Sequence, residues 1–245
     1  MKKQIWGHII RSILAFLMIV IIVVGCYLEY VILQYYRIED NTNLAIVDKN
    51  SNSIDMNGVY SISTYNIGFG AYSQDYSFFM DEGDMLDGTH KQGKYAKGKS
   101  KDEVLKNTKG SIAIIESLNT DFMFFQEVDK KATRSYKVNQ YEMLLEKFNN
   151  YDATYASNFH SAYLLYPFND VIGKTEAGIV TLSKYDISEA TRYSLPIDES
   201  FPTRFFDLDR CFSISRVKLS NGKELVLINV HLSAYDEGGI IRKAQ

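Results

Sequence analysis

The sequence of 245 residues predicts a mixed α/β domain preceded by one N-terminal transmembrane helix. Residues 12–28 carry no charge and are almost wholly apolar. Beyond them, short runs of β-forming residues alternate with segments whose apolar residues have helical spacing, as in α/β domains. Apolar residues make up 46% of the chain and charged residues 23%, so the bulk of it is globular rather than disordered.

The uncharged N-terminal stretch predicts a membrane anchor. Residues 12–28 alone are short for a spanning helix, but the apolar pattern resumes after one glutamate and extends the span to 12–33. Lys2, Lys3 and Arg11 precede this stretch, so the positive-inside rule places the N-terminus in the cytoplasm. We therefore expect a single-pass protein of the cell membrane whose body faces outward and which contacts the membrane through residues 12–33.

Two other interpretations of this segment stay open. A secretory signal peptide has the same layout of charged and apolar residues. Val23-Val24-Gly25-Cys26 is similar to a loose bacterial lipobox, which would make the protein a lipoprotein with lipid on Cys26. The apolar residues beyond Cys26 argue against this, because a mature lipoprotein usually continues as a polar tether. All of these interpretations place the body of the protein outside the cytoplasm.

The body of the protein is acidic. Residues 1–37 hold four of the 27 basic residues and one of the 30 acidic residues, which leaves the remainder with a net charge of −6. A domain that binds duplex nucleic acid non-specifically usually has a basic surface, and this composition does not indicate one. Cys26 and Cys211 are far apart in the sequence, so the chain has neither a disulfide framework nor a zinc pattern.

The chain divides into an anchor, a tether and one domain. Residues 1–37 form the basic tip and anchor, the polar residues 38–58 predict a short tether, and 59–245 remain as the domain. Within the domain, apolar alternation predicts strands and helical spacing predicts helices. The strands are expected at 59–67, 121–128, 154–166, 176–185, 211–219 and 224–232, and the helices at 101–118 and 138–148.

Three connecting segments complete this prediction. Asn221-Gly222 is a strong turn signal, so the last two strands are expected to form a hairpin. Residues 71–100 show no clear period and predict a functional surface loop. The aromatic residues between positions 72 and 79 either dip into a membrane interface or pack on the domain. Residues 239–245 are expected to open a further helix.

Polar residues of catalytic type lie at the ends of four predicted strands. Asn66 and Glu127 close the first two, Glu176 opens a third, and His231 closes the last. Because open α/β sheets place ligands at strand ends, we expect these side chains to converge. A carboxylate at the end of a buried strand is costly, which favours a functional role for Glu127. A single Asn or His at such a place is more often a turn former or a structural residue.

The order and context of these residues resemble a known family. Four short motifs occur in series, and together they are similar to motifs of the endonuclease/exonuclease/phosphatase family: Thr64-Tyr65-Asn66-Ile67-Gly68, Phe125-Gln126-Glu127-Val128-Asp129, residues 176–183 and Asn229-Val230-His231-Leu232. The resemblance covers residues 60–245. It implies an α/β fold of four layers, in which two mixed β-sheets are flanked by helices. It also implies the activity of a metal-dependent phosphoesterase, whether phosphodiesterase, phosphatase or nuclease.

The resemblance also implies a role for individual residues. Asn66 and Glu127 match the positions that hold a divalent metal, expected to be Mg²⁺ with Mn²⁺ as a possible substitute; carboxylate and amide oxygens suit such cations. His231 matches the histidine that contacts the scissile phosphate, and Glu176 the carboxylate that orients this histidine. Arg210 matches a phosphate-contacting arginine, and guanidinium geometry suits a phosphate. Arg210 also follows two aspartates, so a simple ion pair with them is the alternative.

The sequence departs from the family pattern at its end. A Gly-Asp-x-Asn motif and a Ser-Asp-His motif, which position and activate the nucleophile in the family, do not occur before Gln245. We therefore expect a fragment that lacks the C-terminal catalytic part, with no useful hydrolysis and with unpaired strands at an exposed edge of the second sheet. The alternative is a membrane-tethered pseudoenzyme or binding module without catalysis.

The choice of substrate is open at this level. The acidic body and the membrane anchor mildly favour a lipid head group or a small soluble phosphoester over nucleic acid as the phosphoester substrate. Lys130, Lys131, Arg134 and Lys137 follow the second strand, and a basic run of this kind is usually a solvated face. Next to a phosphate site it would also suit a polyanionic head group. No protein partner is inferred.

Overall fold

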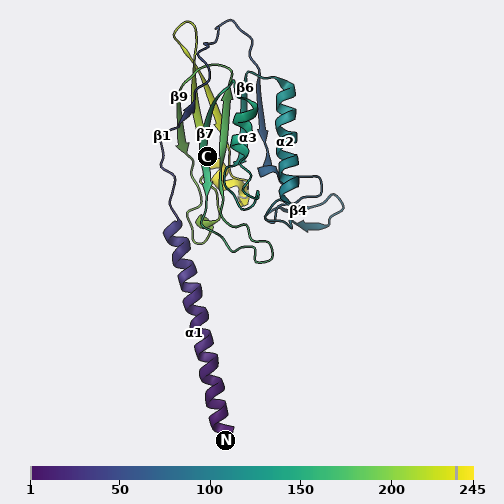
Figure 1. Cartoon of the computed structure of the whole chain (residues 1–245), viewed down its shortest axis with the longest axis vertical. Coiled ribbons are helices and arrows are strands. Elements are labelled where there is room, and N and C mark those ends of the chain that lie inside the picture. Colours follow the sequence, from purple (N-terminus) through teal and green to yellow (C-terminus); the bar gives the residue numbers. More distant parts are fainter. Residues whose placement is uncertain (1, 235–236) are drawn as a thin grey trace. The chain divides into compact units, whose positions relative to one another are not determined.

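The computed structural model describes residues 2–234 and 237–245, and the chain divides into two compact units, Met1–Tyr36 and Arg37–Gln245. The first unit is a single helix, α1 (Lys2–Gln34) (Figure 1). Its apolar part, Gln4–Gln34, is long enough to cross a membrane, because about 20 helical residues span the hydrocarbon core. The side chains of Lys2 and Lys3, on which the expected orientation partly depends, lie outside the described part of the chain.

The second unit contains two large β-sheets and one short hairpin. The five-stranded sheet has the order β2 (Ile46–Val47), β7 (Asp152–His160), β8 (Glu176–Ser183), β6 (Phe122–Asp129) and β3 (Ile62–Asn66). The four-stranded sheet has the order β1 (Thr42–Asn43), β9 (Ile187–Ser194), β10 (Cys211–Lys218) and β11 (Glu224–Val230). Among the described residues of these two sheets, β3 and β6 form the one parallel pair. The chain segment that connects them contains a helix. The hairpin consists of β4 (Glu82–Asp84) and β5 (His90–Gln92).

Two helices cover one face of the five-stranded sheet (Figure 1). The first, α2 (Lys101–Leu118), begins where Ser100 accepts a hydrogen bond from the backbone N–H of Glu103, and it ends at Asn119 in a left-handed conformation. The second is α3 (Gln140–Lys147). Ile112 and Ile115 of α2 and Leu144 of α3 join Met123, Phe125, Val180 and Leu182 of the sheet in one buried cluster. The predicted helices at 101–118 and 138–148 are thereby confirmed.

The other face of the five-stranded sheet packs on the four-stranded sheet. Phe122 of β6 lies in one cluster with Ile187, Val217 and Leu227 of the second sheet. On β11 the outward residues Val226, Ile228 and Val230 are exposed, and this strand lies at the edge of its sheet. The described residues therefore form three layers, helices, sheet and sheet. The four-layer arrangement that the family resemblance implied is not shown, because no described helix covers the outer face of β11.

The segment expected to be a tether is built into the second unit. Residues 38–58 supply β1 and β2, one to each sheet, and Ile54 is buried in the intersheet core. The carboxylate of Asp152 accepts hydrogen bonds from the backbone N–H groups of Lys49 and Asn50 at 2.7 and 2.8 Å. The polar residues that suggested a flexible segment thus belong to turns whose backbone groups bond to the sheets.

The predicted strands are largely confirmed, with differences at some strand ends and with strands that were not predicted, β1, β2, β4, β5 and β9. The first begins at Ile62 rather than residue 59, where its pairing with β6 starts, and the strand expected at 154–166 ends at His160. The strand β9 was not predicted, because Glu189 and Arg192 interrupt its apolar pattern. Arg192 is nevertheless buried, and its guanidinium donates to backbone oxygens of Glu39, Ser157 and Asp209 at 2.8–3.1 Å. The hairpin of β10 and β11 and a short helix at Ile240–Ala244 (α4) agree with the sequence.

A pair of buried amides connects the two sheets. Nδ2 of Asn229 on β11 donates to the carbonyl oxygen of Val180 at 2.9 Å, and its Oδ1 accepts from Nε2 of Gln126 on β6 at 2.8 Å. Gln126 directly precedes Glu127, and Asn229 lies two residues before His231. This amide pair therefore fixes the position of those two strand ends relative to each other.

Replacement of Asn229 by leucine is expected to lower the free energy of unfolding by about 2–3 kcal/mol, because it leaves a buried carbonyl and a buried amide short of partners. Urea unfolding in detergent, followed by the near-ultraviolet circular dichroism of the tyrosines, measures the change. Asn52→Leu on the exposed surface is the matched control and should shift stability by no more than about 0.5 kcal/mol. Equal stability of the two variants would contradict a role for the amide pair.

Candidate functional site

Asn66 and Glu127 meet at the carboxyl ends of the two parallel strands. Because β3 and β6 run in the same direction with Asn66 opposite Gln126, both chains leave the sheet at the same edge. Nδ2 of Asn66 donates to Oε1 of Glu127 at 2.9 Å. Oδ1 of Asn66 accepts the backbone N–H of Gly68 at 2.9 Å, which fixes the orientation of the amide. The two residues that the sequence assigned to a metal are thus in direct contact.

A β-bulge turns Glu127 toward the other sheet. The register of β6 against β8 shifts between Phe125 and Val128, and Glu127 adopts a left-handed φ of 56°. Phe125 and Val128 both face the helices, so the alternation of side chains changes between them. Without the bulge, period two would place Glu127 on the helix side with Phe125. A left-handed conformation costs a non-glycine residue about 1 kcal/mol, and such cost is typical of residues placed for function.

His231 approaches the same carboxylate from the second sheet. It directly follows β11 on the inward-facing side, in step with Leu227 and Asn229. Its Nε2 lies 3.6 Å from Oε1 of Glu127. Its Nδ1 lies 3.2 Å from Nδ2 of Asn158 on β7. An amide N–H that donates to Nδ1 leaves the ring proton on Nε2, where it faces the space beside Glu127.

The electrostatic surroundings keep His231 neutral. Burial and, to a smaller extent, the positive charges of Arg210 and Arg134 together lower the pKa of His231 to about 3. The contact with Glu127 is therefore not an ion pair at neutral pH, although its 3.6 Å separation lies within ion-pair distance. A neutral imidazole serves here as a hydrogen-bond donor rather than as a cation.

Two buried arginines supply the positive charge of the site. Arg210 is 2% exposed and Arg134 is 5% exposed. Arg134 forms two hydrogen bonds to the fully buried Asp129, at 2.9 and 3.2 Å, and its guanidinium lies 4.1 Å from the centre of the Phe69 ring. The carboxylate of Asp209, next to Arg210, accepts from the side chain of Arg37 at 2.7 Å.

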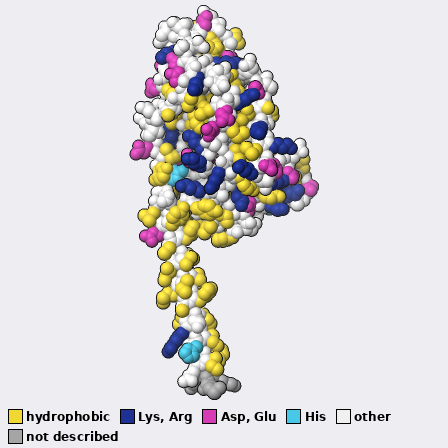
Figure 2. All heavy atoms as spheres, viewed as in Figure 1, with side chains coloured by type: hydrophobic (Ala, Val, Ile, Leu, Met, Phe, Trp, Pro, Cys, Tyr) yellow, Lys and Arg dark blue, Asp and Glu magenta, His cyan; other side chains and the backbone are white. Residues whose placement is uncertain are grey.

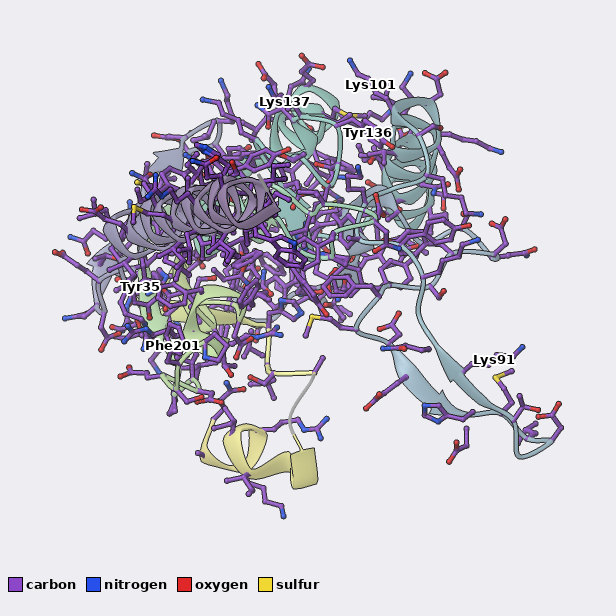
Figure 3. The ribbon with its side chains drawn as sticks, turned by 90° about the horizontal axis from the view of Figure 1, so that it is seen from below. Tyr35, Lys91, Lys101, Tyr136, Lys137 and Phe201 are labelled. Carbon is purple, nitrogen blue, oxygen red and sulfur yellow. The ribbon has the colours of Figure 1, made fainter. Side chains whose placement is uncertain are left out.

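The basic run after β6 does not form one solvated face. Lys131 and Lys137 are exposed, as expected, and Lys137 projects from the surface beside Tyr136 in Figure 3. Arg134 instead points inward, because Ala132 and Ser135 beside it are buried and the segment folds back on the sheet. The sequence prediction was therefore wrong for Arg134, whose partner Asp129 could not be recognised from a charge count.

Glu176 lies on the opposite face of its sheet from His231. Neighbouring Ala177 lines the pocket beside His231, so alternation along β8 directs Glu176 toward the helix side. On that side, burial lowers the pKa of Lys130, and the negative charge of Glu176 opposes this effect in part. In the described part of the chain, Nδ1 of His231 contacts Nδ2 of Asn158. The structure therefore does not support Glu176 as the residue that orients His231, and Asn158 occupies that place.

The donor atoms fit a hard divalent cation that keeps part of its water shell. Glu127 supplies a carboxylate with a 23% exposed side chain, whereas Asn66 turns its amide nitrogen to that carboxylate and its oxygen to Gly68, so coordination by Asn66 requires its amide group to turn over. Among the described residues, no group of three or more His, Cys, Asp or Glu side chains gathers as a metal site. A cation with few protein ligands and several waters, such as Mg²⁺, matches this donor set better than zinc, which requires three or four nitrogen or sulfur ligands.

A pocket of about 90 Å³ adjoins these residues. One end is polar and is lined by Glu127, Asn158, His231, Arg134 and Arg210. Apart from Asp207, the remaining lining is apolar and consists of Phe69, Tyr72, Phe78, Phe79, Met80, Phe159, Leu164, Ile172, Ala177, Phe206, Leu208 and Ala234. The aromatic residues expected near position 72–79 thus pack partly on the domain, since Tyr76 and Phe78 are buried around Phe69.

The comparison with known proteins finds similar chains among the solved structures. No family profile matches the chain, and no curated protein matches it. An endonuclease/exonuclease/phosphatase from Beutenbergia cavernae DSM 12333 is similar in structure, with 16% identity and a TM-score of 0.45 over 70% of this chain and 37% of that chain. ANGEL2, a 2',3'-cyclic phosphatase, in complex with adenosine-2',3'-vanadate, has 13% identity and a TM-score of 0.43 over 85% and 49%.

TDP2 from Caenorhabditis elegans is also similar, with 17% identity and a TM-score of 0.36 over 61% of this chain and 36% of that chain. The match covers less than half the length of each of these three proteins. The family that the motifs resemble is thus represented among the similar solved structures.

Proposed function

We propose that this protein is a metal-dependent hydrolase of phosphoester bonds. The observation that carries the proposal is the meeting of Asn66, Glu127 and His231, which come from three strands in two sheets. Structural packing does not require a bulged glutamate, a neutral buried histidine and a buried arginine at one pocket end. Together they provide a metal ligand set, a hydrogen-bond donor and a phosphate-binding cation.

The roles of the residues follow from their surroundings. A divalent cation held by Asn66 and Glu127, Mg²⁺ or Mn²⁺, would polarise a phosphoryl oxygen and offset the negative charge that grows in the transition state. His231 donates its Nε2 proton to a phosphoryl oxygen, and Asn158 holds the ring in the required tautomer. We assign the direct phosphate contact to Arg210, because it matches the phosphate-contacting arginine of the family that the motifs resemble and lines the same pocket as His231.

A hydrolysis assay on the protein isolated from its own membrane tests this function. With bis(4-nitrophenyl) phosphate as substrate we expect turnover in Mg²⁺, none in excess chelator, and a loss of about 100-fold or more in kcat for His231→Ala. Lys131→Ala, which removes an exposed charge from the same region, is the control and should keep its rate. An unchanged rate in His231→Ala would contradict the assignment, and binding of Mg²⁺ without any turnover would favour a binding module.

We also propose that α1 anchors the protein in the cell membrane with the second unit facing outward. The length and apolar character of Gln4–Gln34 support a span. Extraction of membranes with alkaline carbonate should leave the protein in the pellet, and added protease should reach the second unit in intact cells. A mature N-terminus at Cys26 or beyond would instead indicate a lipoprotein or a removed signal peptide.

A further inference from the structure

The pocket next to the proposed phosphate site is polar at one end and apolar elsewhere. At the polar end, Asn158 is 1% exposed, and among the described residues its Oδ1 has no hydrogen-bond partner. A buried amide oxygen of this kind is costly unless a ligand or water satisfies it. Because this oxygen is an acceptor, its position beside His231 marks the place of a hydrogen-bond donor, such as a water molecule or a hydroxyl group of a ligand, next to the phosphoryl group.

The apolar wall continues from the pocket to the surface. Phe79 and Phe206 line the pocket, and both contact Tyr166, with ring centres 5.8 and 6.1 Å apart. Tyr166 in turn contacts Phe168, which is 87% exposed. We call these four residues the aromatic rim. They come from three separate loops, so no single local packing requirement explains their meeting.

Hydrophobic side chains also gather at one end of the domain in the view of Figure 2. Met80 at 39% and Phe206 at 37% exposure lie where the pocket meets the surface. Contiguous exposed apolar surface of this kind usually marks a binding site. The projecting β4–β5 hairpin, with Lys91 on its far side, lies away from the rest of the domain (Figure 3).

We propose that the substrate is an amphiphilic phosphoester, whose phosphoryl group binds at the polar end and whose adjacent apolar chain enters the pocket and leaves along the aromatic rim. This rests on the proposed function of the same site. The pocket has a volume of about 90 Å³ and a mostly apolar lining, which suits a short segment of methylene groups. Longer chains continue over Tyr166 and Phe168.

The polar end takes one phosphoryl group and not a chain of phosphates. Arg210 and Arg134 line the pocket together with the carboxylates of Glu127 and Asp207, and Arg134 is paired with Asp129, so the pocket holds little excess positive charge. The body as a whole has a net charge of −6, as noted above, and such a charge repels a polyanion. A single phosphoester with an apolar substituent is the chemistry that satisfies both ends of the pocket.

Binding of alkyl phosphonates tests this without any need for turnover. Isothermal titration with methyl-, propyl-, hexyl- and octylphosphonate in Mg²⁺, below their micelle concentrations, should show affinity rising by up to about fourfold per methylene until the pocket is filled. Met80→Ser and Phe206→Ser should flatten this dependence. Val59→Ser, which removes an exposed apolar residue outside the pocket lining, should leave it unchanged.

The outcomes separate the substrate class from the activity. Equal affinity for methyl- and hexylphosphonate would overturn the amphiphile proposal even if the protein hydrolyses phosphoesters. A chain-length dependence without any hydrolysis would support the pocket assignment and contradict the proposed activity. A comparison of monomeric hexylphosphonate with phosphatidic acid in vesicles then shows whether a soluble or a bilayer source supplies the ligand, since only a bilayer substrate gives tighter binding in vesicles.

Discussion

Replacement of Arg134 by methionine is expected to destabilise the protein by about 3–5 kcal/mol. Asp129 is fully buried, and both of its carboxylate oxygens accept hydrogen bonds from Arg134, so the variant leaves a carboxylate charge in the interior without its partner. The loss also removes the guanidinium from the Phe69 ring, 4.1 Å away. Urea unfolding followed by tyrosine circular dichroism measures the change, because the single tryptophan, Trp6, lies in the anchor helix and does not report on the second unit.

Two further variants make this expectation specific. Lys137→Met changes an exposed residue of the same basic run and should shift stability by no more than about 0.5 kcal/mol. The double variant Asp129→Leu with Arg134→Met removes both charges and should recover part of the stability that Arg134→Met loses. If the two variants Arg134→Met and Lys137→Met were equally stable, the ion pair would contribute little to stability. The segment after β6 would then be the solvated face that its composition suggested.

Replacement of Glu127 by glutamine is expected to weaken Mn²⁺ binding by about 100-fold or more, because it removes the carboxylate to which the proposed site assigns the cation. Electron paramagnetic resonance of Mn²⁺ titrated with the protein measures the free ion directly. Asn66→Ala should weaken binding by about tenfold or more, since it removes the amide that both donates to Glu127 and supplies an oxygen.

Glycine at position 127 gives the matching test of the backbone. Glu127→Gly relieves the left-handed φ of 56° and is expected to be as stable as the original protein or about 0.5–1 kcal/mol more stable, while it binds no Mn²⁺. This combination would show that the glutamate is kept for function at a cost to folding. A strongly destabilised Glu127→Gly that still binds Mn²⁺ would mean that the side chain is structural and that the metal site lies elsewhere.

Much of the fold follows from local patterns in the sequence. Ser100 and the apolar residues at helical spacing predict α2, the continuous run from Phe122 to Phe125 predicts a buried strand, and Asn221-Gly222 predicts the final hairpin. The meeting of Asn66 and Glu127 was also predictable, because the ends of neighbouring parallel strands lie at one edge of a sheet; His231 joins them from the second sheet.

The rest depends on contacts between residues far apart in the chain. The bulge that directs Glu127 into the pocket arises from pairing with β8 and has no local signal. Asn158 was missed as a site residue for the same reason, since its partner His231 defines its role, and Arg134 was considered only as one member of a basic run because its partner Asp129 could not be recognised. Glu176 was assigned to the site because a strand begins there, but alternation along β8 directs it to the other face of the sheet.

A crystal structure of the protein with Mn²⁺ and hexylphosphonate tests the central claim most directly. The account predicts anomalous density for one Mn²⁺ in contact with Glu127 and Asn66, and the phosphonate group between that ion, Arg210 and His231, with its alkyl chain in the aromatic pocket. Mn²⁺ density at another place, or a phosphonate group that does not contact Arg210 or His231, would contradict the assignment of these residues to one metal-dependent phosphoester site.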